Sequence, residues 1–302
     1  MPDITAAIAS AVAQGLDRLD AQLLLLRAWG AEPALANTRR AWLMAHGDEA
    51  VPAAVQVQFR NSVSRRLAGE PLAYITGHKE FFGLDLHVDA RVLIPRPDTE
   101  TLVQWALELL AAPRPTHRDT PLAVLDLGTG SGAIALALKY QQPDVEVHAI
   151  DASGDALVVA RANAQRLGLP IRFSQGCWLD GVERRYDGIV SNPPYVAAHD
   201  PHLAELTYEP STALVAGNDG LRDIRQIVGA AKTHLHPGAW LLIEHGYDQG
   251  AAVRELLEAA GYASVTTRRD LGQQERCTGG KMPLTGPTTR AGRLSATGLP
   301  GW

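Results

Sequence analysis

The chain has 302 residues, of which 46% are hydrophobic and 20% charged, a composition typical of a soluble globular protein with one large and one small domain. Its formal net charge of −5 argues against a bulk electrostatic grip on nucleic acid, and its two cysteines exclude a disulfide framework and a zinc cluster. The N-terminus has no basic region, and the run Leu23–Leu26 is too short for a signal peptide or a membrane span. We therefore expect a cytoplasmic protein.

Residues 1–70 are predicted to be helical. Apolar side chains recur at helical spacing at Leu16, Leu19, Leu23 and Leu26, and Pro52 stands where a first-turn proline belongs. No strand pattern interrupts this stretch, which predicts a small helical bundle. The pattern alone leaves open whether the bundle is a packing module or binds a partner.

A β-hairpin linker is predicted for residues 71–92. Its strands are expected at Tyr74–Thr76 and Leu84–Val88, because Gly77 and Gly83 lie between two short β-type runs. After it, Asp98 or Thr99 can cap a helix. Arg96, held between two prolines, is either a surface charge or a residue that faces a site.

Residues 93–282 alternate between strand-like and helix-like runs, which predicts an α/β fold with a doubly wound, mostly parallel sheet. The strands are expected at 122–127, 145–150, 171–173, 186–191, 240–244, 264–268 and 275–281. The helices between them are expected at 133–140, 155–167, 221–235 and 251–260. The last two strands have no helix between them and indicate an antiparallel hairpin at one edge. The tail 283–302 is rich in Gly, Thr and Pro and is expected to be disordered.

A glycine-rich loop follows the first strand of this sheet. The residues Asp126-Leu127-Gly128-Thr129-Gly130-Ser131-Gly132 lack the spacing G-x-G-x-x-G of dinucleotide-binding loops. The pattern D-x-G-x-G-x-G is instead the usual loop of S-adenosylmethionine-dependent methyltransferases. Glycines let the backbone turn tightly and approach a ligand, and the following helix offers N–H groups to an anion. We therefore expect Gly128, Thr129, Gly130, Ser131 and Gly132 to bind the cofactor.

Two further residues stand at positions suited to the same cofactor. Asp151 ends the second strand, where a carboxylate can accept both ribose hydroxyls, although a helix N-cap is the competing interpretation. Trp178 follows the third strand, where it can contact an adenine or simply pack in the core.

The sequence Asn192-Pro193-Pro194-Tyr195 closes the fourth strand. Both prolines lack N–H groups and fix φ, so the strand stops abruptly at the sheet edge where ligands of open α/β folds bind. A planar NH2 group held there would find acceptors in the Asn192 side-chain oxygen and the Pro193 carbonyl, and Tyr195 could stack on it. A plain exit from strand to loop is the alternative.

Taken together, these motifs resemble the HemK-type N5-glutamine methyltransferases, which modify peptide chain release factors. The resemblance covers about residues 15–282 and rests on Gly69–Ile75, Arg91–Glu100, Asp126–Gly132, Ser191–Tyr195, Glu209-Pro210 and Thr212–Gly217. The N-P-P-Y motif is shared with adenine-N6 methyltransferases. The segment Ile94–Glu100 and the helical N-terminal domain narrow the resemblance to the release-factor enzymes.

The resemblance implies a class I methyltransferase domain at 93–282 that uses S-adenosylmethionine and no metal. It implies that Asn192, Pro193, Pro194 and Tyr195 bind the target glutamine of a Gly-Gly-Gln motif, with Asn192, Pro193 and Tyr195 catalytic and Asn192 also touching the cofactor. The helical domain would grip the rest of a class 1 release factor. One departure is Cys177, where family members often have an Asp that could bond the adenine amino group.

Three alternatives remain open at this point. They are a glutamine methyltransferase acting on a ribosomal protein, an adenine-N6 nucleic-acid methyltransferase, and a non-catalytic binding module. The acidic net charge disfavours the second and the intact motifs disfavour the third. We expect a monomer that contacts neither nucleic acid nor a membrane directly.

Overall fold

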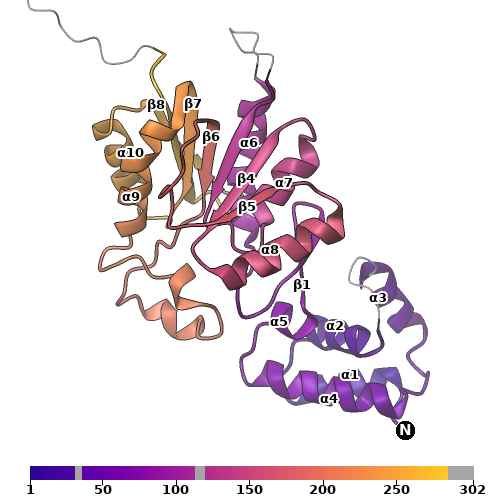
Figure 1. Ribbon diagram of the computed structural model, residues 1–302. Coiled ribbons are helices and arrows are strands. Elements are labelled where there is room, and N and C mark those ends of the chain that lie inside the picture. Colours follow the sequence, from indigo (N-terminus) through magenta and orange to yellow (C-terminus); the bar gives the residue numbers. More distant parts are fainter. Residues whose placement is uncertain (31–35, 113–119, 285–302) are drawn as a thin grey trace, which may run out of the picture.

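The computed structural model describes residues 1–30, 36–112 and 120–284 (Figure 1). From residue 285 onward, the tail predicted to be disordered lies outside the described residues.

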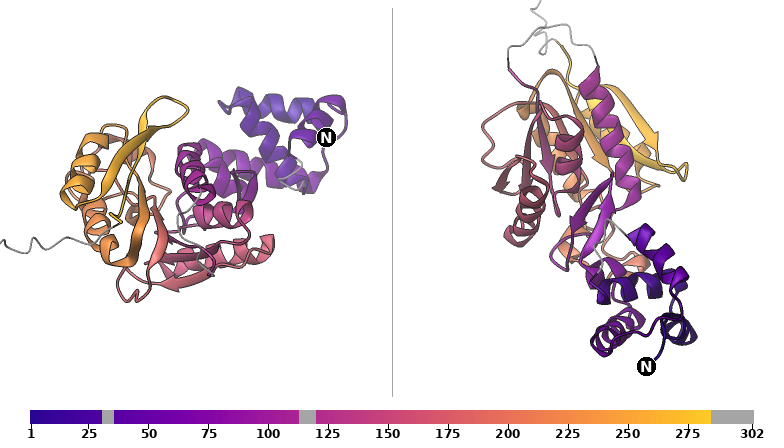
Figure 2. Two further views of the ribbon diagram at one scale, coloured as in Figure 1. Left: turned by 90° about the horizontal axis from the view of Figure 1, so that it is seen from above. Right: turned by 90° about the vertical axis from the view of Figure 1, so that its right-hand side faces the viewer.

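The N-terminal part is helical, as predicted, and is set apart from the sheet in all three views (Figures 1 and 2). Its helices are α1 Ile4–Ala13, α2 Arg18–Ala28, α3 Ala36–Ala45 and α4 Ala53–Leu67. Asp3 and Asp17 cap α1 and α2 by accepting backbone N–H groups at 2.7 Å. The helices enclose their own core, in which α2 buries Leu24 and Leu25 while Leu19 is exposed.

One prediction about the linker is wrong. Tyr74–Thr76 is not a strand but part of the short helix α5 Leu72–Thr76, which ends at Gly77 with a φ of 77°. The hairpin does exist, and it pairs β1 His78–Phe81 antiparallel with β2 Leu84–His87. The physical reason is packing on two sides, because Ile75 joins the core of the helical region while Tyr74 packs with Val88.

A seven-stranded sheet forms the second part of the molecule, with the strand order β5-β4-β3-β6-β7-β9-β8. The strands are β3 Ala123–Leu127, β4 Glu146–Asp151, β5 Arg172–Gln175, β6 Tyr186–Ser191, β7 Leu235–Glu244, β8 Ala263–Arg269 and β9 Glu275–Lys281. The first five in the spatial order pair in parallel, and β9 is antiparallel to both β7 and β8. The predicted parallel sheet with an antiparallel edge is therefore confirmed.

Helices cover both faces of this sheet (Figures 1 and 2). They are α6 Glu100–Ala111, α7 Ala133–Gln141, α8 Gly154–Leu167, α9 Arg222–Ala231 and α10 Gly250–Ala259. One buried cluster joins α6 and α7 to the sheet through Leu102 and Leu136. The other joins α9 and α10 through Ile224 and Val253. In this doubly wound arrangement the parallel strands all end on the same side of the sheet. The predicted site residues follow these carboxyl ends.

Candidate active site

The two motifs singled out in the sequence leave the sheet side by side. In the parallel pairing of β3 with β6, Leu127 lies opposite Ser191, and the Ser191 hydroxyl donates to the Leu127 carbonyl at 2.8 Å. The chain leaves β3 toward β4 and β5 and returns on the other side of β3 as β6. This reversal is the topological switch point, the place where open α/β sheets bind ligands.

The glycine loop turns through left-handed backbone conformations at Gly128, Gly130 and Gly132, with φ of 72°, 56° and 87°. A Cβ on Gly132 would lie 3.0 Å from the Leu136 side chain, whereas nothing lies within 4 Å of a Cβ placed on Gly130. The loop is therefore packed against the chain at Gly132 and open at Gly130. An open, strongly curved backbone is what close approach of a ligand requires.

Hydrogen bonds to β3 and β4 hold the loop in this shape. The amides of Gly128 and Thr129 donate to the Ile150 carbonyl at 2.8 and 3.0 Å. The side chains of Thr129 and Ser131 are buried, and the Thr129 hydroxyl donates to Asp126 at 2.7 Å. The Thr129 hydroxyl is therefore engaged by Asp126 within the chain.

Asp126 is a fully buried carboxyl beneath the loop. Burial raises its pKa to about 7, against the opposing effect of the Thr129 hydroxyl. Its Oδ2 also accepts the Ala135 amide at 3.2 Å, while Oδ1 has no hydrogen-bond partner. The group connects β3, the loop and the first turn of α7.

Asp151 lies at the end of β4 with its carboxylate against the loop. One oxygen accepts the Gly130 amide and the other accepts the Ser153 amide, both at 2.8 Å. The N-cap of α8 is Ser153, whose Oγ accepts the Ala156 amide at 3.1 Å, so the N-cap interpretation of Asp151 is wrong. Burial raises the Asp151 pKa. Each oxygen has accepted one hydrogen bond within the chain and retains capacity for another.

Trp178 has a left-handed backbone with a φ of 51°, which is rare for a bulky residue. Its indole lies against Gly128, where an added Cβ would meet the ring at 3.3 Å. The ring is half-buried and packs on the cluster beneath α9 and α10, so it contributes to the core as well as bordering the loop. The neighbouring Cys177 is exposed.

Asn192 lies directly after β6 and is half-buried. Its Nδ2 donates to the hydroxyl of Thr99 at 3.2 Å, which leaves Oδ1 as the free end of the amide. Thr99 ends the 3₁₀ turn Pro97–Thr99, so the segment that follows Arg96 reaches the N-P-P-Y motif across the chain. The Nδ2 end of the side chain is thus held by Thr99.

The rest of the motif is anchored by backbone contacts. Pro193 is buried, and Pro194 and Tyr195 are half-buried. Val196 and Val215 form a parallel β-bridge, in which the Val196 amide donates a hydrogen bond to the Leu214 carbonyl at 2.9 Å. This bridge holds the exit from β6 in place.

Sequence reasoning missed a carboxylate next to this motif. Glu244 ends β7 and is 1% exposed, and the Tyr195 hydroxyl donates to its Oε1 over a long 3.4 Å. Burial raises the pKa of Glu244 to about 7 and also raises that of Tyr195. The available signal was an acidic residue that closes an otherwise apolar buried strand, Trp240–Glu244.

Arg96 pairs with Glu209, a buried carboxylate that also accepts the Ile94 amide at 3.0 Å. The arginine is therefore not a free surface charge, because it joins the segment before α6 to the loop that follows the N-P-P-Y motif. Next to it, the Tyr208 hydroxyl donates to the Ala68 carbonyl at the end of α4 over 3.0 Å. This loop therefore contacts the helical region as well.

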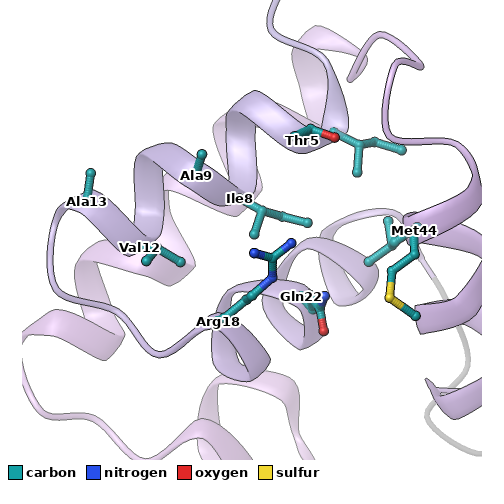
Figure 3. Close-up of a pocket in the computed structure, with 10 residues that line it drawn as sticks. Thr5, Ile8, Ala9, Val12, Ala13, Arg18, Gln22 and Met44 are labelled. Atoms are coloured by element: carbon teal, nitrogen blue, oxygen red, sulfur yellow. The ribbon is translucent and has the colours of Figure 1, made fainter.

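A separate hollow of about 480 Å³ lies between α1, α2 and α3 (Figure 3). Ile8, Val12, Arg18 and Met44 are among its lining residues. None of the predicted site residues lines this hollow, so it is distinct from the candidate site at the carboxyl ends of the strands.

Comparison with known proteins places both parts of the chain. Residues 5–77 match the family model of the PrmC N-terminal domain, and residues 106–213 match that of the methyltransferase small domain. Among curated proteins, the chain is 46% identical over 284 residues to the release factor glutamine methyltransferase of Burkholderia pseudomallei, covering 90% of this chain and 94% of that one. It is 50% identical to the enzyme of that name from Pseudomonas aeruginosa, covering 87% and 92%.

Solved structures with the same fold are more distant. A methyltransferase from Pyrococcus furiosus aligns with a TM-score of 0.51 at 20% identity, covering 74% of this chain and 98% of that one. A human methyltransferase 10 domain containing protein aligns with a TM-score of 0.51 at 18% identity, covering 76% and 98%. Within the described residues, no helix is long and apolar enough to span a bilayer.

Proposed function

Because the chain belongs to the family of release factor glutamine methyltransferases, we propose that it methylates the side-chain amide nitrogen of the glutamine in the Gly-Gly-Gln motif of class 1 release factors, with S-adenosylmethionine as the donor. The observation that carries this proposal is the meeting of the glycine loop and Asn192 at the switch point, with the Asn192 amide held by Thr99. Since release factors act in translation, we place the protein in the cytoplasm.

The residues at the loop fit this cofactor. Asp151 has acceptor capacity left for ribose hydroxyls, Gly130 leaves open space, and the Trp178 ring is available to an adenine beside Gly128. Gly128–Gly132 would hold the remainder through their backbone. Because the Cys177 side chain cannot accept as a carboxylate does, adenine recognition relies on Trp178 and backbone groups. When bound, S-adenosylmethionine supplies an electrophilic methyl group on a sulfonium.

The acceptor residues act on a nitrogen that is a poor nucleophile, since its lone pair is delocalised into the carbonyl. The Asn192 Oδ1 and the Pro193 carbonyl would accept the two N–H hydrogens of the glutamine amide. Out-of-plane acceptors favour a pyramidal nitrogen and orient its lone pair toward the donor. Pro194 and the ring of Tyr195 would line the pocket around the amide. No strong base is required, because a methylated, positively charged amide loses its proton readily.

The helical region would orient the rest of the release factor. It contacts the loop after the N-P-P-Y motif through Tyr208 and Ala68, so a partner bound to the helices lies beside the loop that borders the acceptor site. This contact supports a docking role for residues 1–70.

The decisive experiment offers labelled S-adenosylmethionine with three acceptors in separate reactions: a class 1 release factor, a ribosomal protein fraction and DNA. We expect label in the release factor alone. A release factor whose Gly-Gly-Gln glutamine is replaced by alanine is the control and should remain unlabelled. Label in that control, or only in ribosomal protein or DNA, would refute the proposal.

A further inference from the structure

Glu209 is a buried carboxylate whose two oxygens hold one segment of the chain at two points. Its side chain is 4% exposed. Oε2 accepts the Ile94 amide at 3.0 Å, and Oε1 accepts the Arg96 guanidinium. A buried carboxylate is tolerated when its oxygens are paired in this way. Because the partners lie more than a hundred positions apart in sequence, these bonds fix the segment 94–96 to the loop that follows the N-P-P-Y motif.

The same segment leads directly to the side chain that holds Asn192. Arg96 lies between two prolines, whose rings restrict the backbone, and it is the N-cap of the 3₁₀ turn Pro97–Thr99. Its carbonyl accepts the Thr99 amide at 3.1 Å. The Thr99 hydroxyl in turn accepts the Asn192 Nδ2 group at 3.2 Å. A continuous path of hydrogen bonds therefore leads from Glu209 through Arg96 and Thr99 to Asn192.

The turn has a second support, which is more open to solvent. Asp98 pairs with Arg276 of β9 at 3.3 Å, and Arg276 also donates to the buried Asp270 at 3.0 Å. The Asp98 side chain is 50% exposed, and ion pairs that water can reach are weak. Loss of the buried Glu209 contacts should therefore displace the turn more than loss of the Asp98 pair.

We propose that Glu209, acting through Arg96 and Thr99, is a positioning residue for methyl transfer. It sets the place of Thr99, and so the direction in which the Asn192 amide presents Oδ1 to the acceptor nitrogen. Without Glu209, the segment 94–96 loses both attachments, Thr99 can move away from Nδ2, and the Asn192 amide is free to rotate. This inference rests on the proposed function, because the acceptor is taken to be the amide NH2 of a glutamine.

The test compares full-length Glu209→Gln, Arg96→Gln and Arg96→Lys with the parent. Single-turnover transfer to release factor is measured at saturating cofactor and acceptor, with a melting curve for each variant. We expect Glu209→Gln and Arg96→Gln to transfer at least about tenfold more slowly, because a small displacement of an orienting group lowers the rate strongly. Arg96→Lys keeps the charge and should retain most of the parent rate. Arg96 is 36% exposed, so its variants decide the matter even if Glu209→Gln does not fold.

Arg268→Gln is the matched control. Arg268 is 34% exposed, against 36% for Arg96, and pairs with Glu108 of α6 at 2.6 Å. Glu108 lies toward the opposite end of α6 from Thr99. The control therefore loses an ion pair of similar exposure without disturbing the turn, and it should keep the parent rate.

A double-mutant cycle separates positioning from general support of the fold. If Glu209 acts through Asn192, then Glu209→Gln and Arg96→Gln should each change the rate of an Asn192→Ala enzyme by less than about twofold, because the amide that they position is gone. An equal loss of about tenfold in both backgrounds would refute the inference. A folded Glu209→Gln or Arg96→Gln enzyme within about twofold of the parent rate would refute it as well.

A further measurement does not depend on turnover. In ¹⁵N-labelled protein, the side-chain amide signals of Asn192 are assigned by their loss in Asn192→Ala. They should move in Glu209→Gln and in Arg96→Gln, and stay in place in Arg268→Gln. Signals that stay in place in a folded Glu209→Gln or Arg96→Gln protein would overturn the inference even if no release factor were methylated. Failure of transfer in the parent alone would refute only the proposed function.

Discussion

Asp151 shows how one carboxylate serves both the fold and the proposed cofactor site. It already accepts the Gly130 and Ser153 amides, each at 2.8 Å. Bonds from ribose hydroxyls would be charge-assisted and contribute roughly 1.5–3 kcal/mol each. We predict that Asp151→Ala weakens S-adenosylmethionine binding at least about tenfold by calorimetry. Asp155→Ala, on an exposed position of the first turn of α8, is the matched control and should bind as the parent does. Unchanged affinity in a folded Asp151→Ala protein would remove Asp151 from the site.

A second prediction at the residue scale concerns Asn192 and the rate of methyl transfer. Replacement by Ala removes the side-chain acceptor and leaves one substrate N–H without a partner, which usually costs about 10²–10³ in turnover. Asn192→Asp still offers an acceptor, so it should retain more activity than Ala. It should stay below the parent, because it lacks the NH2 group that donates to Thr99.

The measurement is single-turnover transfer at saturating cofactor, paired with a melting curve. A merely structural Asn192 would lower the melting temperature of both variants and leave turnover per folded molecule unchanged. A rate for the Ala variant within about threefold of the parent rate would contradict the proposed role, because it corresponds to a rise of under roughly 1 kcal/mol in the activation barrier.

At the scale of elements, the segment before α9 packs against the backbone of the N-P-P-Y motif. Gly220 has a φ of 72°, and a Cβ there would overlap the carbonyl oxygen of Tyr195. The same oxygen accepts the Gln249 side chain at 3.0 Å. Only glycine therefore lets this segment pass so close to the motif.

We predict that Gly220→Ala displaces the Tyr195 backbone and slows methyl transfer at least about tenfold, with a loss of roughly 1–3 kcal/mol in stability. Gly229→Ala is the control, because Gly229 lies inside α9 and nothing is within 4 Å of its added Cβ. That variant should gain roughly 0.5–1 kcal/mol and keep its rate. Denaturant unfolding and single-turnover assays measure both. A Gly220→Ala enzyme with the parent's rate would show that the motif tolerates movement of its support.

At the scale of the whole molecule, α5 joins the two parts. Ile75 packs into the helical core and Tyr74 into a cluster with Val88, and the Tyr74 hydroxyl donates to the Val92 carbonyl at 2.6 Å. A protein that begins at Pro71 therefore keeps the Tyr74 contacts and exposes Ile75. Ile75→Ser in the same truncated chain reduces the apolar surface that would cause aggregation.

We predict that this truncated chain still binds cofactor, because the glycine loop and Asp151 lie in the retained part. It should methylate intact release factor at least about tenfold more slowly, having lost the surface that orients its partner. A short peptide with the Gly-Gly-Gln motif is the matched substrate, and its slow methylation should be equal for both chains. A folded truncated enzyme that matches the full chain on intact release factor would rule out docking by the helices.

The sequence alone was enough for the glycine loop, the N-P-P-Y motif and the mostly parallel sheet, but not for Tyr74–Thr76. The central strands β3 and β6 are short, fully buried runs, and the alternation of strands with helices predicts the parallel order. The glycine loop and the N-P-P-Y motif are each contiguous in sequence and directly follow an apolar run, so local pattern suffices to place them at two strand ends. The strand predicted at Tyr74–Thr76 was wrong because three residues with β-type side chains are too few to show a periodicity. Packing on two sides made this segment helical.

Only the tertiary structure decided how the site is supported. Thr99 reaches Asn192 across 93 positions of sequence, Ile94 reaches Glu209 across 115, and Tyr195 reaches Glu244 across 49. Such side-chain hydrogen bonds depend on which strands become neighbours and in what register. No local spacing encodes them, because each partner's direction is set by the backbone of a different element. The chemistry could therefore be predicted from the sequence, while the orientation of the Asn192 amide depends on contacts that exist only once the sheet has assembled.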